Sequence, residues 1–168
     1  DYTGKFNTTG SVTIGSTAKI ELSSAAGTIA SMWGNGTLSN DVLFKTNYQL
    51  GDSSGTTFTL SGNVSIADGK TLTVGGVNPN VTISGTLSGA NAILTASAGT
   101  TNLFGNTTIG TLNSSATTNI QGETSITTAN ITGGTTNFSS TSTTIGTLNY
   151  QSGSALNFSQ NSISTVKA

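Results

Sequence analysis

A heptapeptide that occurs twice constrains this chain more than any other feature of its sequence. The segment Thr-Thr-Ile-Gly-Thr-Leu-Asn occupies residues 107–113 and recurs at residues 143–149. Ile126 lies at the matching place roughly midway between Ile109 and Ile145, so it divides the interval into two turns. A turn of about 18 residues is too short for a pair of packed helices, but it is long enough for one turn of a β-solenoid. The spacing therefore predicts a stack of short β-coils.

A second periodic signal runs beside the heptapeptide. The segments TTNL, TTNI, TTNF and ALNF each place an asparagine directly before a large apolar residue. These asparagines recur at nearly equal intervals: Asn102, Asn119, Asn137 and Asn157. Apolar residues of matching phase predict one inward-facing core column: Leu60, Ile83, Leu103, Ile120, Phe138 and Phe158.

The asparagines have two interpretations. In the structural one, which we favour, each side-chain amide donates to a carbonyl of the next coil and satisfies backbone groups at the bends, as in the Asn ladders of stacked strands. In the functional one, the amides are surface hydrogen-bonding groups for a glycan.

The residue types agree with a solenoid. Thr, Val and Ile favour pleated strands, and Gly and Asn supply the sharp bends between them. No apolar stripe with helical spacing is present. We expect an all-β fold, a parallel β-helix (β-solenoid) with coils of about 17–20 residues, which forms one domain over residues 1–168.

Residues 31–57 interrupt the regular spacing, because bulky side chains fall there at uneven intervals. We expect an irregular cap, or a loop excursion packed on the solenoid, since an open sheet edge needs cover. The alternative is a ligand-binding region around Trp33 and Tyr48.

Charge is scarce, with five Lys, six Asp or Glu, no Arg and no His, for a net charge of −1. Nucleic-acid binding depends on Lys and Arg against phosphates, so we expect no nucleic-acid partner. No apolar run approaches the roughly 20 residues of a spanning helix, so we expect no membrane insertion by this segment. Cysteine is absent, which excludes disulfides and thiolate metal sites.

The sequence does not support catalysis. A nucleophilic triad lacks its base because there is no His. Glycoside hydrolysis needs two carboxylates across one bond, and the six acidic residues are scattered through the chain. The calcium motif GGxGxD is absent, and no glycine-rich phosphate loop precedes a helix. We therefore expect no enzyme activity, metal or cofactor.

Ice binding is a less favoured alternative. Threonine-rich solenoids can present flat Thr-x-Thr faces, but most threonine pairs here are adjacent, and neighbours in a strand point to opposite faces. Isolated Thr-x-Thr spacings occur at only a few positions: Thr57, Thr59, Thr71, Thr73, Thr141 and Thr143.

Nine Asn-x-Ser/Thr sequons are present, and two of them, at Asn137 and Asn157, belong to the predicted ladder. If the source glycosylates asparagine, the remaining candidates for surface sugar are Asn7, Asn35, Asn63, Asn80, Asn106, Asn113 and Asn130.

At residues 100–160 the heptapeptide pair, the TTN-apolar segments and the turn length resemble the passenger domains of bacterial autotransporters and the filamentous-haemagglutinin-like secreted adhesins. The resemblance implies a right-handed parallel β-helix that is secreted to the cell surface. It implies a structural and adhesive protein, whose partners are a glycan or a host-cell receptor. The strand edges at either end of the rod predict self-association into a fibre, or continuation of a longer solenoid. The alternative function is a carbohydrate- or cell-receptor-binding module that uses the aromatic region at 31–57.

Overall fold

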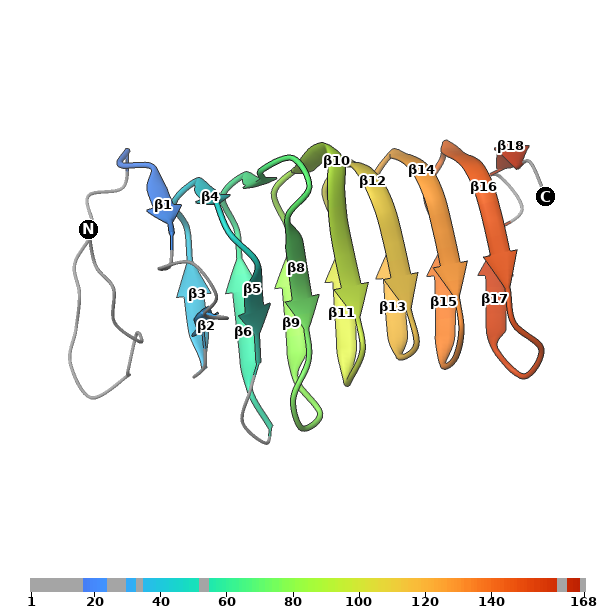
Figure 1. The fold of residues 1–168 in the computed structure, drawn as a ribbon, viewed down its shortest axis with the longest axis horizontal. Helices are drawn as coiled ribbons and strands as arrows, with labels where there is room; N and C mark the ends of the chain where they lie inside the picture. The colour runs from blue at the N-terminus through green and yellow to red at the C-terminus, as the bar shows by residue number, and fades with distance from the viewer. Residues whose placement is uncertain (1–16, 24–29, 33–34, 52–54, 160–162, 167–168) are drawn as a thin grey trace.

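The computed structural model describes residues 17–23, 30–32, 35–51, 55–159 and 163–166. All regular structure in these residues is β-strand, and it forms an elongated stack of about six coils (Figure 1). Strand pairing between successive coils is parallel throughout. The predicted all-β parallel solenoid is therefore confirmed.

Each coil has three faces. The first face holds short strands and the first halves of longer ones: β1 (Ile20–Leu22), β4 (Val42–Phe44), β7 (Val64–Ile66), β10 (Leu87–Ala96), β12 (Thr107–Ser114), β14 (Thr124–Ile131), β16 (Thr143–Tyr150) and β18 (Ile163–Val166). The second face holds the second halves of β10, β12, β14 and β16 with three short strands: β2 (Ala30–Met32), β5 (Tyr48–Leu50) and β8 (Thr71–Val74). The third face is a separate sheet: β3 (Gly36–Leu38), β6 (Thr57–Leu60), β9 (Asn80–Ile83), β11 (Thr100–Leu103), β13 (Thr117–Ile120), β15 (Thr135–Phe138) and β17 (Ala155–Phe158).

Strand β10 shows how one strand serves two faces. Leu87 and Ser88 pair with β7, whereas residues 93–96 pair with β8. The register shifts between Gly89 and Ile93, and there the strand passes from the first face to the second.

Coil length changes along the rod. From β11 to β17, the third-face strands follow one another at intervals of 17–20 residues, as predicted, so that Asn102 pairs with Asn119 and Asn137 with Asn157. Strands β3 to β8 each lie 22–24 residues before their partner in the next coil, so that Val42 pairs with Val64 and Tyr48 with Leu72. The predicted coil length therefore holds for the C-terminal part of the rod, and the coils that begin with β3 to β8 are longer.

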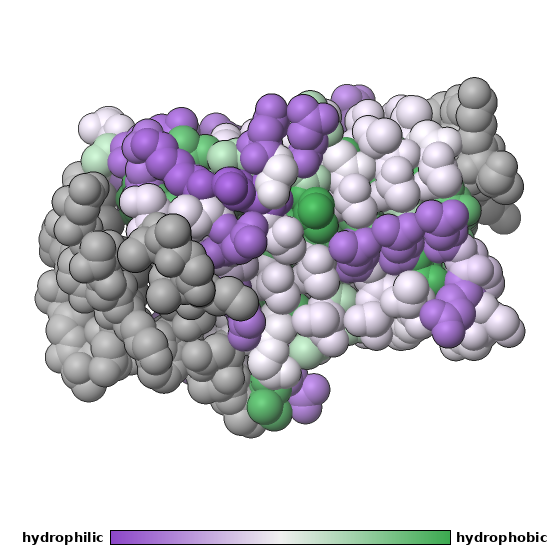
Figure 2. Space-filling view, in the orientation of Figure 1, coloured by the Kyte–Doolittle hydropathy of each residue, from purple (hydrophilic) through white to green (hydrophobic). Residues whose placement is uncertain are grey.

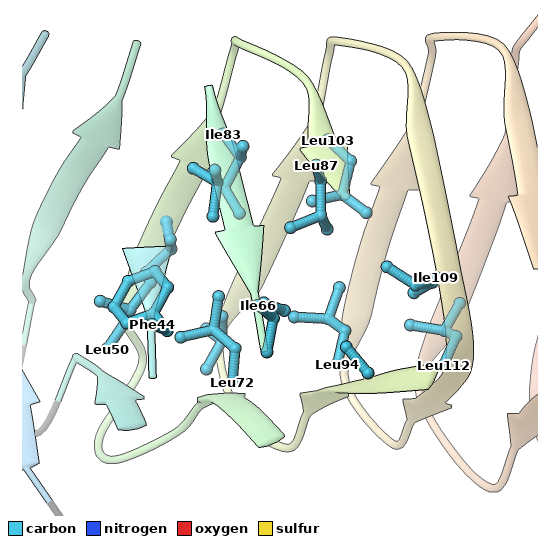
Figure 3. Packing of buried hydrophobic residues seen from close by; sticks show 14 of the residues in the cluster. Phe44, Leu50, Ile66, Leu72, Ile83, Leu87, Leu94, Leu103, Ile109 and Leu112 are labelled. Carbon is cyan, nitrogen blue, oxygen red and sulfur yellow. The ribbon is translucent and has the colours of Figure 1, made fainter. Parts of the chain in front are cut away.

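In-register apolar side chains fill the interior (Figure 3). On the third face, parallel pairing aligns the six residues of the predicted core column, from Leu60 to Phe158. Five of the six are buried, and Phe158 is half-buried. Because parallel pairing puts equivalent residues one coil apart, a sequence repeat becomes a stack of like side chains.

The region at 31–57 differs from the expected cap or loop excursion, because its described strands are ordinary coil strands. Strands β3, β4 and β5 each pair in register with a strand of the next coil. Val42, Phe44, Tyr48 and Leu50 point inward and are at most 5% exposed. These four residues are therefore core residues of the longer coils.

The interior also contains hydroxyl groups. Thr101, Thr118 and Thr136 are fully buried at one position of three successive coils. The Oγ of Ser114 lies 2.9 Å from the Oγ1 of Thr118 and accepts a hydrogen bond from the Oγ1 of Thr136 over 2.9 Å. Ala96 takes the place of Ser114 in the preceding coil, and the Oγ1 of Thr101 has no hydrogen-bond partner in the described structure.

Glycines line the corner between the third face and the first. Each lies two residues after a third-face strand: Gly62, Gly85, Gly105 and Gly122. A Cβ atom on Gly105 would lie 2.1 Å from the carbonyl oxygen of Gly85. The coils therefore approach so closely at this corner that a side chain fits only if the backbone moves.

Candidate functional site

Five asparagines form a hydrogen-bonded row on the outside of the third face. The Nδ2 of Asn119 donates to the Oδ1 of Asn102 over 2.8 Å, and Asn137 donates to Asn119 over 2.8 Å. Asn157 donates to Asn137 over 2.7 Å, and Asn102 donates to Asn80 over 3.0 Å. We call these five residues the asparagine row. The structure thus brings the four predicted asparagines together and adds Asn80.

Asn102, Asn119, Asn137 and Asn157 all point the same way, each with its Nδ2 donating toward the preceding coil. This differs in detail from the expected hydrogen bond to a carbonyl at a bend. For Asn119, Asn137 and Asn157 the acceptor is the side-chain oxygen of the equivalent asparagine, because in-register pairing holds the two amides about 4.8 Å apart. Asn102 is instead in register with Thr82, and its Nδ2 lies 3.0 Å from the Oδ1 of Asn80 and 3.3 Å from the Oγ1 of Thr82. A carboxamide has two N–H groups and two acceptor lone pairs, so Asn119 and Asn137 each use half of their capacity within the row.

A second row of the same kind lies on the second face. Asn149 donates to Asn130 over 2.7 Å, and Asn130 donates to Asn113 over 2.8 Å. Asn113 donates to the Oγ1 of Thr95 over 3.4 Å. Asn113 and Asn130 were expected from the sequence only as glycosylation candidates. The sequence did contain a pattern that indicates this row, because both copies of the repeated heptapeptide end in an asparagine, Asn113 and Asn149.

An open groove of about 530 Å³ runs along the asparagine row. Four asparagines contribute to it, together with the next outward position of each coil: Phe104, Gln121, Ser139 and Ser159. Phe138 and Phe158 also border the groove. Phe138 is fully buried, and its ring stacks on that of the half-buried Phe158 with centroids 5.0 Å apart. Phe104 is 43% exposed, which makes it one of the few large apolar side chains on the described surface. None of the ten lining residues is charged.

Tyr48 is not available to a ligand. Its side chain is 5% exposed and packs on Phe44 with ring centroids 5.1 Å apart. Burial raises the pKa of Tyr48 to about 12. Its predicted role as a ligand contact is therefore corrected to a core role, since a side chain in the interior cannot reach a surface ligand. Trp33, the other predicted contact, lies outside the described residues.

The glycosylation candidates occupy different environments. Asn35, Asn63 and Asn106 are exposed, and the Oδ1 of each accepts a hydrogen bond from a backbone N–H of the next coil. The Nδ2 atoms of Asn113 and Asn130, to which a glycan would be attached, already donate hydrogen bonds within the second row. Asn80 is exposed at one end of the asparagine row, and Asn7 lies outside the described residues.

Two outward columns of threonine each have an asparagine column beside them. On the second face Thr111, Thr128 and Thr147 are aligned by strand pairing, and the next outward column is the Asn113–Asn130–Asn149 row. The same arrangement occurs on the third face, where Thr100 and Thr117 adjoin the asparagine row. In these described coils the outward pattern is thus Thr-x-Asn, whereas the ice-binding alternative depends on Thr-x-Thr.

Charged groups contribute little to the described surface. Its one salt bridge joins Lys45 to Glu21, and both side chains are about half exposed. A hydrogen bond from Lys45, together with its positive charge, lowers the pKa of Glu21. No group of three or more acidic side chains lies together in the described coils as a metal site would require, and no helix there is long and apolar enough to cross a membrane.

Comparisons with models of protein families, with curated proteins and with solved structures found no significant match. Functional inference for this chain therefore rests on the geometry of the rod itself.

Proposed function

We propose that this chain belongs to a structural and adhesive protein outside the cell, in which the β-solenoid is a rod that presents a surface or joins another rod end to end. The proposal is supported by the rod shape and by a neutral polar exterior. Figure 2 shows that exterior on one side of the molecule, where most of the coloured surface is pale or hydrophilic and hydrophobic residues are scattered.

The observation that carries the proposal is the edge at β17. This strand pairs with β15 on one side and is the last third-face strand in the described structure. Leu156 and Phe158 are only half-buried there, whereas Phe138, one coil earlier, is fully buried. An edge strand is a template for another strand, so either a second copy or a further coil of a longer chain would complete the burial.

Sedimentation measurements test end-to-end association. We expect the purified chain to show larger species as its concentration rises. The variant Asn157→Lys should remain monomeric, because a charge on an edge strand opposes strand addition. Ser125→Lys adds the same charge on the first face away from the edge and should associate like the parent chain. A single monomeric species of the parent chain at high concentration would contradict association.

Electron microscopy gives a second readout of assembly. Filaments with an axial repeat near one rod length are expected from the parent chain but not from Asn157→Lys. Antibody labelling of intact cells of the source organism tests the surface location, and labelling that requires permeabilised cells would contradict it.

A further inference from the structure

We propose that the groove beside the asparagine row binds a neutral linear glycan that lies along the rod axis. This inference rests on the adhesive part of the proposed function and names the chemical class of its ligand. It places the site on the third face of the C-terminal coils, away from the aromatic region at 31–57.

The asparagine row supplies a fixed array of polar groups. Each amide is oriented by the hydrogen bond to its neighbour, and each is half-buried or exposed. Asn119 and Asn137 still have one N–H and one carbonyl lone pair each, so they can donate to and accept from a sugar hydroxyl. Because the side chains are already ordered, binding loses little further conformational entropy.

The lining favours an uncharged ligand. All ten residues around the groove are neutral, so a phosphate or carboxylate would leave water without gaining a charged partner. An extended peptide gains affinity mainly by adding a strand to a sheet edge. Strands β11, β13 and β15 beneath the groove are each paired on both sides, so they offer no such edge. The edge strand β17 lies at one end of the groove, and a peptide strand added to it would run across the rod axis, not along the asparagine row. Hydroxyl-rich sugars need only the side-chain groups that the groove supplies.

An exposed aromatic ring lies at the end of the groove nearer the N-terminus. Phe104 occupies the same outward position as Gln121 and Ser139 in the following coils. Its exposed ring can pack against the apolar face of a pyranose, while Gln121 and Ser139 contact hydroxyl groups further along. Asn102 and Asn157 are three coils apart, which gives roughly 14 Å for a short run of sugar units.

Sedimentation of the full chain with insoluble polysaccharides tests the proposal. The probes are cellulose, chitin and curdlan, which are neutral linear polymers, and soluble oligosaccharides of the same series serve as competitors. We expect the parent chain to sediment with at least one polymer and to be displaced by the matching oligosaccharide. Failure to bind any of the three would overturn the proposal, as would displacement by an unrelated extended peptide but not by the oligosaccharide.

Two groove variants and one matched control locate the site. Ser139→Trp places an indole in the groove, and Phe104→Ala removes the exposed ring, so each should weaken binding at least tenfold. Ser125→Trp adds the same indole at an exposed serine of the first face, and this variant should bind like the parent chain. Unchanged binding by Ser139→Trp, with circular dichroism showing a folded protein, would overturn the site.

The readouts separate this inference from the proposed function. Rods that assemble and label at the cell surface but bind none of the polysaccharides would overturn the glycan site alone. Glycan binding by a chain that remains monomeric would support the site and count against end-to-end assembly.

Discussion

Thr101 places a hydroxyl group inside the solenoid at a point where its coil offers no hydrogen-bond partner. One coil later, the equivalent Thr118 meets Ser114, but the coil of Thr101 has Ala96 in that place. A buried hydroxyl without a partner costs about 1–3 kcal/mol. The coil of Thr101 therefore lacks a hydrogen bond that the next coil has, and the cost of this difference to the free energy of unfolding can be measured.

Thr101→Val should raise the free energy of unfolding by about 1–3 kcal/mol, since it removes the unpartnered hydroxyl and keeps the side-chain shape. Ala96→Ser should also stabilise the fold by giving Thr101 the partner that Thr118 has. Denaturant unfolding measures both changes. Thr118→Val is the matched control and should lose about 0.5–1.5 kcal/mol, because its hydroxyl is hydrogen-bonded. Equal effects at positions 101 and 118 would contradict this account.

Tyr48 makes the fold sensitive to alkali. Its folded-state pKa of about 12 exceeds its unfolded value of 10.0. The stability due to the neutral phenol is therefore complete below pH 10 and is lost as the pH rises toward 12. The shift corresponds to roughly 2–3 kcal/mol. Tyr48→Phe should unfold less readily than the parent chain at high pH, whereas Tyr150→Phe, at an exposed tyrosine, should not. Identical alkaline unfolding of the parent and Tyr48→Phe would argue against a buried phenol.

At the element scale, the corner between the third and first faces sets how closely the strands stack. Four glycines occupy it in successive coils, and the backbone of each lies against the backbone of the preceding coil. The strands on either side can then pair at the parallel spacing of about 4.8 Å. The corner thus helps to keep both the asparagine row and the core column in register.

Gly105→Ala should be strongly destabilising, by roughly 3 kcal/mol or more, because the added Cβ meets the carbonyl of Gly85 and neither backbone can move freely. Gly69→Ala is a useful comparison. That residue has a φ of +68° but open space around it, so only the backbone strain of about 1–2 kcal/mol is expected. Thermal unfolding would contradict the close-approach argument if the two variants lost the same stability.

The same elements show what the sequence alone could and could not predict. The TTN-apolar segments predicted strands β11, β13, β15 and β17 and their alignment, because equal spacing converts directly into parallel register. The coil strands within residues 31–57 were missed, since the longer coils there broke the period and the large side chains were taken for a cap. Tyr48 was misassigned for the same reason. The groove could not be predicted, because its lining depends on how residues from four successive coils lie together in three dimensions.

The whole molecule is stabilised by contacts between neighbouring coils and by very little electrostatics. The sequence has no charged residue from 71 to 122 or from 124 to 166. In the described part of the chain, Lys45 and Glu21 form the one salt bridge, and it is exposed. Exposed pairs contribute little to stability.

Stability should therefore change by no more than about 1 kcal/mol when NaCl is raised from roughly 0.05 to 0.5 M. Acid should also have a small effect. The lowered pKa of Glu21 means that its contribution is present above its unfolded pKa of 4.5 and is lost as the pH falls below that value. Denaturant unfolding at several salt concentrations checks this, with Glu21→Gln as a reference. A large salt dependence that persists in Glu21→Gln would show that other charges matter.

Because the amides point in a common direction, they give the rod a dipole along its axis. Each carboxamide is a small dipole, and the aligned amides from Asn102 to Asn157 add their dipoles along the axis. The amino groups face the N-terminal coils and the carbonyl oxygens face the C-terminal ones. The row from Asn149 to Asn113 points the same way on another face. A nearly uncharged surface can thus distinguish one end of the rod from the other. A polymer with two chemically different ends will be held more favourably in one orientation than in the reverse.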